Sequence, residues 1–380
     1  MANVLIVGDT LRSPELRHEV PIGIGDPFLY AERNGSRSIM IGSLEIPRVA
    51  ALGDYEVVAP EQLGQDELLA QGMPRDEMSL ELQLRACRRF GIHDAVVPAT
   101  FPLRVADHLR ASGIELQVDK SFFDDRRRVK SDAEIAGMRR AQKAAEAGMA
   151  AARDLLRRAE ASGNGGGLTL DGEPLTSERI KVAIAQRFIE HDASSDEFIV
   201  SHGPQSAIGH HMGAGQILAG EPIVIDLWPR DAESACFADM TRTFVVGEPS
   251  EEVAEWHRLC TEAIERALAD VKPGVTGVDV FAGTCEIFER HGYPTQRTKE
   301  PGQILSDGFF HSLGHGVGLE VHEEPGLGIT GVKELLAGDV VTLEPGLYRT
   351  GYGGCRLEDL VLVTEDGAEN LTDFPYDLTP

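Results

Sequence analysis

Two aspartates near the middle of the chain are spaced in a way that allows them to share a cation. Asp226 lies in the apolar run Ile223–Leu227, and Asp239 opens the next strand-like run thirteen positions later. A hairpin of that size can bring the two carboxylates together. On its own, such a pair is more typical of a solvated turn, so its interpretation depends on what else the sequence provides.

Three histidines fall within twelve residues of the stretch FFHSLGHGVGLEVHE, which is otherwise mostly apolar side chains and glycine: His311, His315 and His322. Imidazole is a common metal ligand and proton carrier. The alternative is that they are core histidines with hydrogen-bond partners. The stretch is not an HExxH zinc motif, because Gly326 stands where the second histidine would be.

Two glutamates border apolar strands further along. Glu344 follows Val340–Leu343 and precedes a Pro-Gly turn, and Glu358 heads the run that follows it, with Arg356 two residues before. A carboxylate at the end of a buried strand is costly unless it is paired or bound to a metal.

Together these features predict a buried set of four carboxylates and one imidazole: Asp226, Asp239, His315, Glu344 and Glu358. Clustered anions repel strongly where the dielectric is low, and two divalent metal ions would compensate them. The ligand types suit manganese, which we expect first, as well as cobalt, zinc or iron. Two metals about 3.5–4 Å apart clamp a substrate oxygen and lower the pKa of a shared water. The chemistry predicted is metal-assisted hydrolysis of an amide.

The elements that must position these residues are read from periodicity. Residues 1–125 are typical of a small α/β domain, with a strand over 3–8, a hairpin at Asn34–Gly35, a helix over 80–90 and a strand over 95–97. The opening strand ends in glycine, but no GxGxxG follows, so nucleotide binding is not favoured.

Residues 126–380 are predicted to form the second domain. Ser131 and Glu134 make a capping-box signature for a long helix ending at Arg158. A loop over 163–167 follows. Further helices are expected over 176–190, 250–271 and 278–291, and strands over 198–201, 223–227, 241–246, 340–343 and 360–364. Helices thus alternate with strands twice, and each half ends in a strand pair that carries acids. This is compatible with an internal duplication and a fold class of α/β or α+β.

The features, in this order, resemble the pita-bread metallopeptidase family, which includes methionine aminopeptidase, aminopeptidase P and prolidase. The resemblance covers about residues 126–370. It implies that Asp226 chelates one metal, and that His315 and Glu344 chelate the other. Asp239 and Glu358 would bridge the two ions. The halves of the catalytic domain would be related by a pseudo-twofold axis.

The resemblance also implies roles for residues that face the substrate. Glu344 would accept a proton from the bridging water, and His322 would stabilise the tetrahedral oxyanion. In VSHGPQSAIGHHM, the resemblance assigns a substrate-contacting role to His210, which we prefer over the adjacent His211. His202 is expected to be a loop residue.

The first domain places the chain nearer one branch of this family. Residues 1–125 resemble the creatinase-like N-terminal domain of aminopeptidase P and prolidase, and RRVKSDAEIAGMRRA resembles that group's entry into its long helix. His311 and Arg356 match positions that these proline-directed enzymes use near the site. Two departures affect the shape of the pocket: Leu227–Pro229 replace the usual DxG pattern in a hairpin two residues longer than its common form, and Gly209 replaces a proline.

The expected function is therefore an Xaa-Pro exopeptidase, either aminopeptidase P-like or a prolidase, acting on peptides or dipeptides as a homodimer. One alternative keeps the metals and changes the substrate to another small amide or a modified amino acid, because fold does not fix substrate. Another is a metal-free member, either a creatinase-like amidinohydrolase or a non-catalytic binding module. Competent residues at all five ligand positions count against it.

Composition excludes other classes. A net charge of −26 argues against nucleic acid as a partner, and the short basic run Arg126–Arg128 beside Asp124 and Asp125 is interpreted as a solvated turn. No apolar run approaches the ~20 residues that span a membrane, and no signal peptide is expected. The five cysteines are scattered singly without a CxxC pair. They are therefore expected to be small buried side chains in a reducing, cytoplasmic protein.

Overall fold

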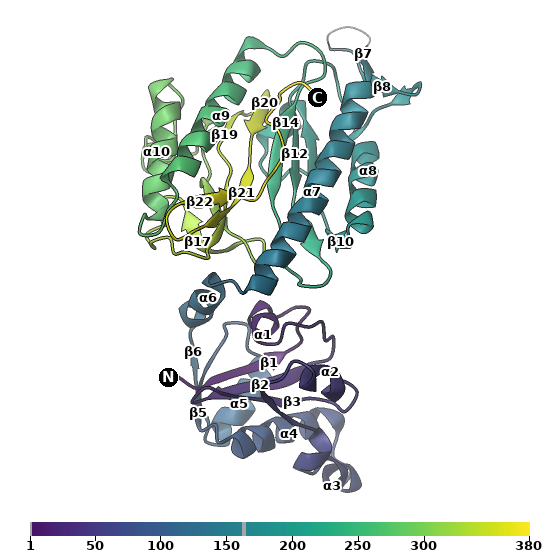
Figure 1. Ribbon diagram of the computed structural model, residues 1–380, viewed down its shortest axis with the longest axis vertical. Helices are drawn as coiled ribbons and strands as arrows, with labels where there is room; N and C mark the ends of the chain where they lie inside the picture. Colours follow the sequence, from purple (N-terminus) through teal and green to yellow (C-terminus); the bar gives the residue numbers. More distant parts are fainter. Residues whose placement is uncertain (1, 162–164) are drawn as a thin grey trace. The chain divides into compact units, whose positions relative to one another are not determined.

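The computed structural model describes residues 2–161 and 165–380 (Figure 1). The chain divides into two compact units, residues 1–127 and 128–380. The predicted domain boundary after residue 125 and the creatinase-like character of the first domain stay predictions. Part of the predicted loop at 163–167 lies outside the described residues.

The first unit is built on a six-stranded mixed sheet with strand order β4-β3-β2-β1-β5-β6. The strands are β1 Val4–Gly8, β2 Phe28–Arg33, β3 Ser36–Met40, β4 Tyr55–Val58, β5 Asp94–Val97 and β6 Glu115–Val118. The helices are α1 Pro14–Glu19, α2 Ile46–Ala50, α3 Gln65–Ala70, α4 Arg75–Phe90, α5 Leu103–Ala111 and α6 Lys120–Arg128, with a 3₁₀ turn at Pro60–Leu63. The predicted hairpin turns at Asn34 and Gly35, with φ of 50° and 80°, as a tight turn between twisted strands requires.

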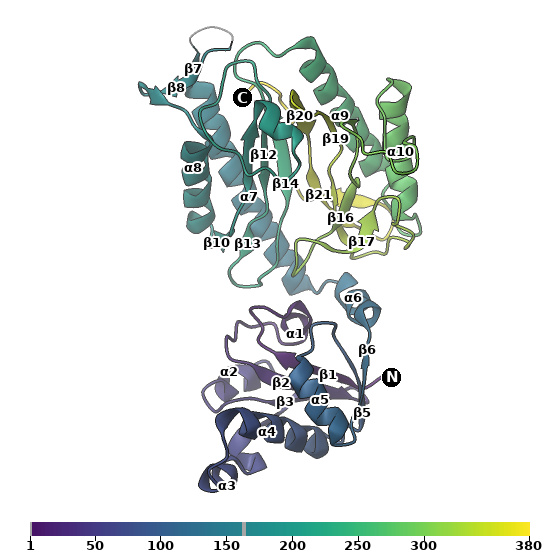
Figure 2. The same cartoon turned by 180° about the vertical axis from the view of Figure 1, so that it is seen from behind.

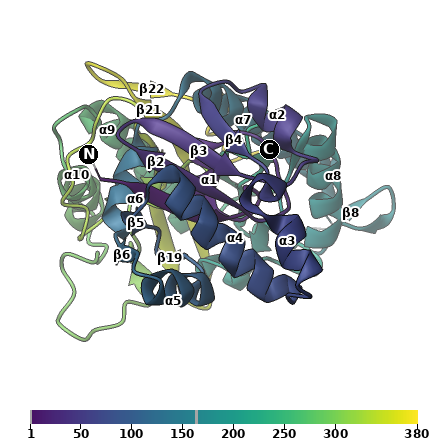
Figure 3. The same ribbon diagram turned by 90° about the horizontal axis from the view of Figure 1, so that it is seen from below.

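Both faces of this sheet are covered because β1 is apolar on both sides. Leu5 and Val7 belong to one core cluster, which includes side chains of α3, α4 and α5. Val4 and Ile6 belong to a second cluster with side chains of α1 and α2. Figure 3 shows α4 in front of the strands. The alternation follows the two-residue period of a strand.

The second unit contains four long helices: α7 Asp132–Arg158, α8 Ser177–Glu190, α9 Glu251–Asp270 and α10 Gly277–Arg290. Ser131 and Glu134 form the predicted capping box of α7. Every helix bound lies within one residue of the predicted one. The strands are β7 Glu160–Ala161, β8 Leu168–Leu170, β9 Glu173–Pro174, β10 Ala193–Ser194, β11 Ile199–His202, β12 Ile223–Leu227, β13 Arg230–Asp231, β14 Met240–Phe244, β15 Asp307–Gly308, β16 Gly314–Gly316, β17 Glu323–Leu327, β18 Val340–Leu343, β19 Gly346–Arg349, β20 Gly353–Arg356, β21 Asp359–Val363 and β22 Ala368–Asn370, with a 3₁₀ helix η2 at Gly203–Ala207.

These elements form two halves. In the first, α7 and α8 share a core with the sheet β11-β12-β14. In the second, α9 and α10 share a core with the sheets β17-β16-β18-β21-β22 and β15-β19-β20. Figures 1 and 2 show the first helix pair beside β12 and the second pair beside β19. A β-bridge between Thr241 and Glu358 joins the halves where the predicted site residues converge.

Arg126–Arg128 do not form a solvated turn, and that prediction is wrong. They end helix α6, and each guanidinium has an acidic partner. Arg126 pairs with Glu19 and Glu32, and buried Arg128 pairs with Asp339 at 2.5 Å. The partners of Arg126 and Arg128 lie about a hundred or more positions away, so a local charge count could not identify them, whereas Arg127 pairs with nearby Asp124.

His202 is also misplaced by the sequence, because it is the buried last residue of β11 and not a loop residue. The cysteine prediction is confirmed in that all five are buried and free.

Among the described residues, no helix has the length and apolar character needed to cross a membrane.

Candidate metal centre

The first half of the second unit supplies two carboxylates from one hairpin. Asp226 lies on β12 opposite Thr241 of β14, and Asp239 immediately precedes β14. The register therefore brings both acids toward the same end of the hairpin. Asp239 is 4% exposed and Asp226 is half-buried.

The second half supplies the remaining three residues from neighbouring strands. His315 lies on β16, Glu344 directly follows β18, and Glu358 directly precedes β21. Strand order places β18 between β16 and β21, so the three side chains start close together. A Cβ on Gly314 would lie 2.0 Å from the backbone oxygen of Thr342, so only glycine allows β16 this close to β18.

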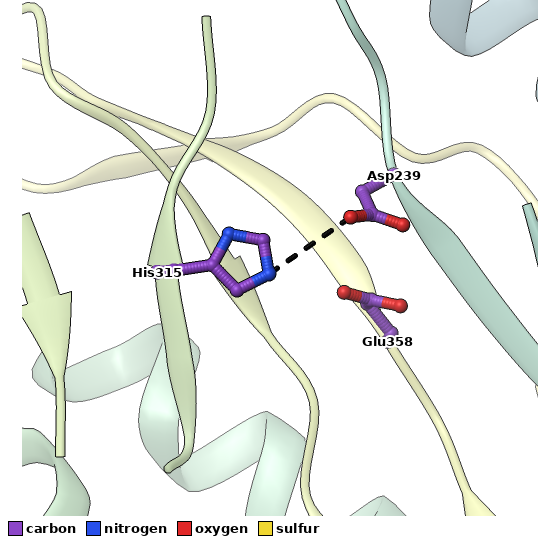
Figure 4. A group of neighbouring side chains, drawn as sticks. All are labelled: Asp239, His315 and Glu358. Carbon is purple, nitrogen blue, oxygen red and sulfur yellow. Dashed lines mark ion pairs between the residues drawn. The ribbon is translucent and has the colours of Figure 1, made fainter. Parts of the chain in front are cut away.

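The side chains converge as Figure 4 shows for three of them. One ligand atom from each of Asp239, His315 and Glu358 lies within 4.8 Å of the others. The Nε2 atom of His315 is 3.9 Å from an Asp239 oxygen and 3.5 Å from a Glu344 oxygen. Asp226 instead accepts a hydrogen bond of 2.5 Å from Arg356. Asp239, His315, Glu344 and Glu358 thus lie in one cluster, and the charge of Asp226, which contributes to raising the pKa of Asp239 after burial and Glu358, is partly paired by Arg356.

The carboxylates are held in an environment that disfavours four negative charges. Burial, and then the charge of Glu358, raise the pKa values of Asp239 and Glu344. Burial, and then Asp226, raise the pKa of Glu358 to about 8. Within the described chain, Asp226 Oδ1 and Asp239 Oδ1 are buried without a hydrogen-bond partner. Buried polar atoms are rarely left unpaired, so the two orphaned oxygens fit a site that takes up cations.

His315 is prepared as a neutral ligand. Burial, and then the charge of His322, lower the pKa of His315 to about 4. Its Nδ1 donates to the Gly316 carbonyl at 3.1 Å, which leaves the Nε2 lone pair directed at the carboxylates. A metal-binding histidine is typically fixed by a hydrogen bond of this kind.

Comparison with known proteins gives this cluster a family. Residues 136–365 match metallopeptidase family M24. The chain belongs to that family. It is 39% identical over 181 residues to a protein named Xaa-Pro dipeptidase from Pyrococcus furiosus, a match covering 47% of this chain and 48% of that protein. The chain therefore spans about half the length of the curated relatives it matches.

Solved structures match over nearly the whole length. The prolidase from Pyrococcus furiosus superposes with a TM-score of 0.74 at 23% identity, covering 99% of this chain and 97% of that one. The X-Pro aminopeptidase from Thermotoga maritima superposes with a TM-score of 0.78 at 23% identity, with the same coverage. These likenesses confirm the predicted pita-bread fold class. Membership of a metallopeptidase family implies divalent metal ions, and the cluster fits them.

A polar chain borders the cluster in this M24 protein. Arg356 Nη1 donates to the Tyr348 hydroxyl at 3.1 Å, and this hydroxyl donates to His311 Nε2 at 2.9 Å. His311 Nδ1 then donates to the Ser312 carbonyl at 2.7 Å. Burial, and then Arg356, lower the pKa of His311 to about 3, so its ring is neutral. His311 and Arg356 thus lie together, as the resemblance implies.

Sequence reasoning missed two side chains of this region. Tyr348 connects His311 to Arg356, and its signal is its position at the end of VVTLEPGLY, four residues after Glu344. Thr241 donates to a Glu358 oxygen at 2.6 Å. Its signal is the strand period, since it lies two residues after Asp239 and so on the same face.

The two remaining predicted residues lie at the exposed side. The His322 ring is exposed, with its centroid 4.3 Å from that of His315. His210 is exposed on the segment after η2, and its charge contributes to lowering the pKa values of His311 and His322, after burial. His211 differs from His210 in that its Nδ1 accepts the Gly213 amide at 3.0 Å, so it is occupied within its own loop.

Proposed function

We propose that this chain is a dinuclear-metal exopeptidase that hydrolyses the N-terminal peptide bond of Xaa-Pro peptides, as an aminopeptidase P or as a prolidase. The observation that carries the proposal is the buried cluster around His315 with its two orphaned carboxylate oxygens. Membership of family M24 and the names of the relatives support the reaction and the substrate.

The ions would be held as the resemblance implies, with Asp226 on one side, His315 and Glu344 on the other, and Asp239 and Glu358 shared. When bound, they supply Lewis acidity and a hydroxide-like nucleophile at neutral pH. Manganese is proposed first, and cobalt, zinc and iron suit the same ligands.

The chain's own residues would handle the protons and the substrate. Burial raises the pKa of Glu344, which suits it to accept a proton from the attacking water and pass it to the leaving amine. His322 would donate a hydrogen bond to the developing oxyanion. His210, on the segment after η2, would contact the substrate. His311 and Arg356, linked by Tyr348, would border the residue after the scissile bond.

The wider setting is part of the proposal. Peptides or dipeptides are the partners, and the net charge of −26 favours an N-terminal ammonium over nucleic acid. A cytoplasmic homodimer is proposed by analogy with the resembling enzymes and from the free cysteines.

A second candidate is hydrolysis of another small amide or a modified amino acid. It is favoured by the lengthened hairpin after Asp226, where Trp228 follows and β13 pairs with β10. A changed wall beside one metal ligand alters which substrates fit and leaves the ligands in place.

The test is hydrolysis of three peptides by manganese-loaded protein: an Xaa-Pro dipeptide, an Xaa-Pro tripeptide and a Met-Ala tripeptide. Release of the first residue from the Xaa-Pro tripeptide establishes aminopeptidase P-like action, and cleavage of the dipeptide alone establishes a prolidase. If none is cleaved while elemental analysis finds two metals per chain, the peptidase proposal is wrong and the second candidate replaces it. Asp239→Asn should lower the metal occupancy of both sites, and two tightly bound metals in that variant would contradict its bridging role.

A further inference from the structure

His202 is a buried histidine outside the metal cluster, and the proposed reaction does not use it. It ends β11 and is 7% exposed. Its register partner is Ile223, the first residue of β12, which is the strand that carries Asp226. The segment 203–214 begins immediately after it and carries His210.

The two ring nitrogens of His202 both meet acceptors. Nδ1 lies 2.9 Å from a Glu221 carboxylate oxygen, and Nε2 lies 3.2 Å from the Ala214 carbonyl oxygen. Neither partner can donate a hydrogen when Glu221 is ionised. The ring therefore bridges the Glu221 carboxylate and the Ala214 carbonyl through its two nitrogens.

The contacts connect two places that the backbone separates. Glu221 lies two residues before β12 and also accepts a hydrogen bond from the Leu218 amide at 3.3 Å. Ala214 closes the segment that leaves β11, and that closure is reinforced by Gln205, which donates to the same carbonyl at 2.9 Å. The His202 ring therefore ties the return of the 203–214 segment to the start of the strand that carries Asp226.

The segment also packs against the other half of the site. The Ser206 hydroxyl accepts the Gly354 amide of β20 at 2.9 Å, and β20 ends at Arg356. His210 lies between Ser206 and the closure at Ala214. Its charge acts on His311 and His322, so its position relative to those rings depends on how the segment is held.

We propose that the His202–Glu221 pair is a positioning device, which holds the 203–214 segment so that His210 faces the substrate. His202 is a positioning residue, since it acts through His210 and touches no metal ligand. The inference rests on the proposed function for the role of His210, whereas the position of His210 can be measured without any activity.

The test compares His202→Phe, which keeps a planar ring and removes both ring nitrogens, with Glu221→Gln, which keeps the shape and removes the charge. Lys181→Met is the matched control, because Lys181 donates to the neighbouring Gly213 carbonyl from α8 and does not touch the pair. Each metal-loaded variant is first checked for metal content and circular dichroism. The readouts are kcat and KM for an Xaa-Pro peptide, the NMR shifts of the His210 ring, and hydrogen exchange of the Gly213 and Ala214 amides.

We expect both pair variants to raise KM about tenfold with kcat changed less than about threefold, because ground-state and transition-state contacts of His210 weaken together. The His210 ring shifts should move and exchange should accelerate, while Lys181→Met stays within about twofold of wild type in KM.

Unchanged His210 shifts in both pair variants would overturn the proposal. Faster exchange with KM and His210 unchanged would also overturn it, since the pair would then only stabilise the fold. If the wild type cleaves no Xaa-Pro peptide, the proposed function fails, while the His210 shifts still decide whether the pair positions that ring.

Discussion

Two arginine–aspartate pairs lie near the Thr241–Glu358 bridge, Arg242–Asp359 on β14 and β21 and Arg356–Asp226 on β20 and β12. They differ in how completely the aspartate oxygens are hydrogen-bonded. Arg242 donates to Asp359 at 2.8 Å, and both side chains are at most 2% exposed. The other Asp359 oxygen accepts from Asn370 and from the Tyr376 hydroxyl. Arg356 donates to Asp226, whose second oxygen has no partner in the described chain.

The difference follows from strand geometry. Neighbouring residues of a strand point to opposite faces. Glu358 therefore faces away from Asp359, and Thr241 faces away from Arg242. On one face the charges of Arg242 and Asp359 are matched by protein groups. On the other face carboxylates with raised pKa values are left short of partners. Buried charge that the protein completes is structural, and buried charge left incomplete marks a site for a ligand.

The largest effect should come from the incomplete face. Glu344→Gln removes a metal ligand and the proposed proton acceptor in one change, so turnover on an Xaa-Pro peptide should fall by about 10³-fold or more. The measurement is kcat with manganese at saturation. A variant that works like wild type would remove Glu344 from the mechanism.

The carboxylates of the two faces should also contribute differently to the stability of the metal-free protein. Asp359→Asn leaves Arg242 buried without its counter-charge and should lower the free energy of unfolding by about 3 kcal/mol. Asp239→Asn removes a charge that burial and its acidic neighbours disfavour, so it should be neutral or stabilise by about 1 kcal/mol. Urea denaturation of both variants checks the contrast. Equal losses in the two would mean that the distinction between the faces is wrong.

The sequence could predict these faces only in part. Glu344 and Glu358 stand at the ends of apolar strands, and the capping box of α7 is local, so both were visible in the pattern. The partner of Asp226 is 130 positions away, and that of Arg128 is 211 away. Pairings of this range depend on how strands from different halves meet, which composition and periodicity do not encode.

A smaller effect is expected in how the stability of the metal-free protein depends on pH, because the incomplete face carries Glu358. The folded-state pKa of Glu358 is raised to about 8, so between its unfolded value and about 8 the folded state binds the extra proton. Stability is therefore present at lower pH and is lost as pH rises through about 8, by about 1 kcal/mol between about pH 7 and pH 8. The pKa values of His311 and His315 are lowered to about 3 and about 4, so both rings are neutral in the folded state over this interval. In the unfolded chain these rings titrate mostly below pH 7, so they offset the loss only slightly.

The measurement is the free energy of unfolding of metal-free protein across that interval, with Glu358→Gln as the matched control. The control should show a flatter profile, and so should the metal-loaded wild type, because bound cations take the place of the protons. A metal-free wild type that is as stable at the upper end as at the lower would show that Glu358 is ionised throughout.

The smallest effect should come from an ion pair that belongs to neither face. Arg139 and Glu369 form a two-bonded pair at 2.7 and 2.8 Å, with both side chains 45% exposed. Water screens such a pair and competes for its hydrogen bonds, so Arg139→Gln should change the free energy of unfolding by less than about 0.5 kcal/mol. Metal content and kcat should not change, because no metal ligand touches this pair. A loss as large as that of Asp359→Asn would mean that the stabilisation by an ion pair depends on how completely its atoms are hydrogen-bonded, and not on its burial. The difference between the two faces would then be one of hydrogen bonding alone.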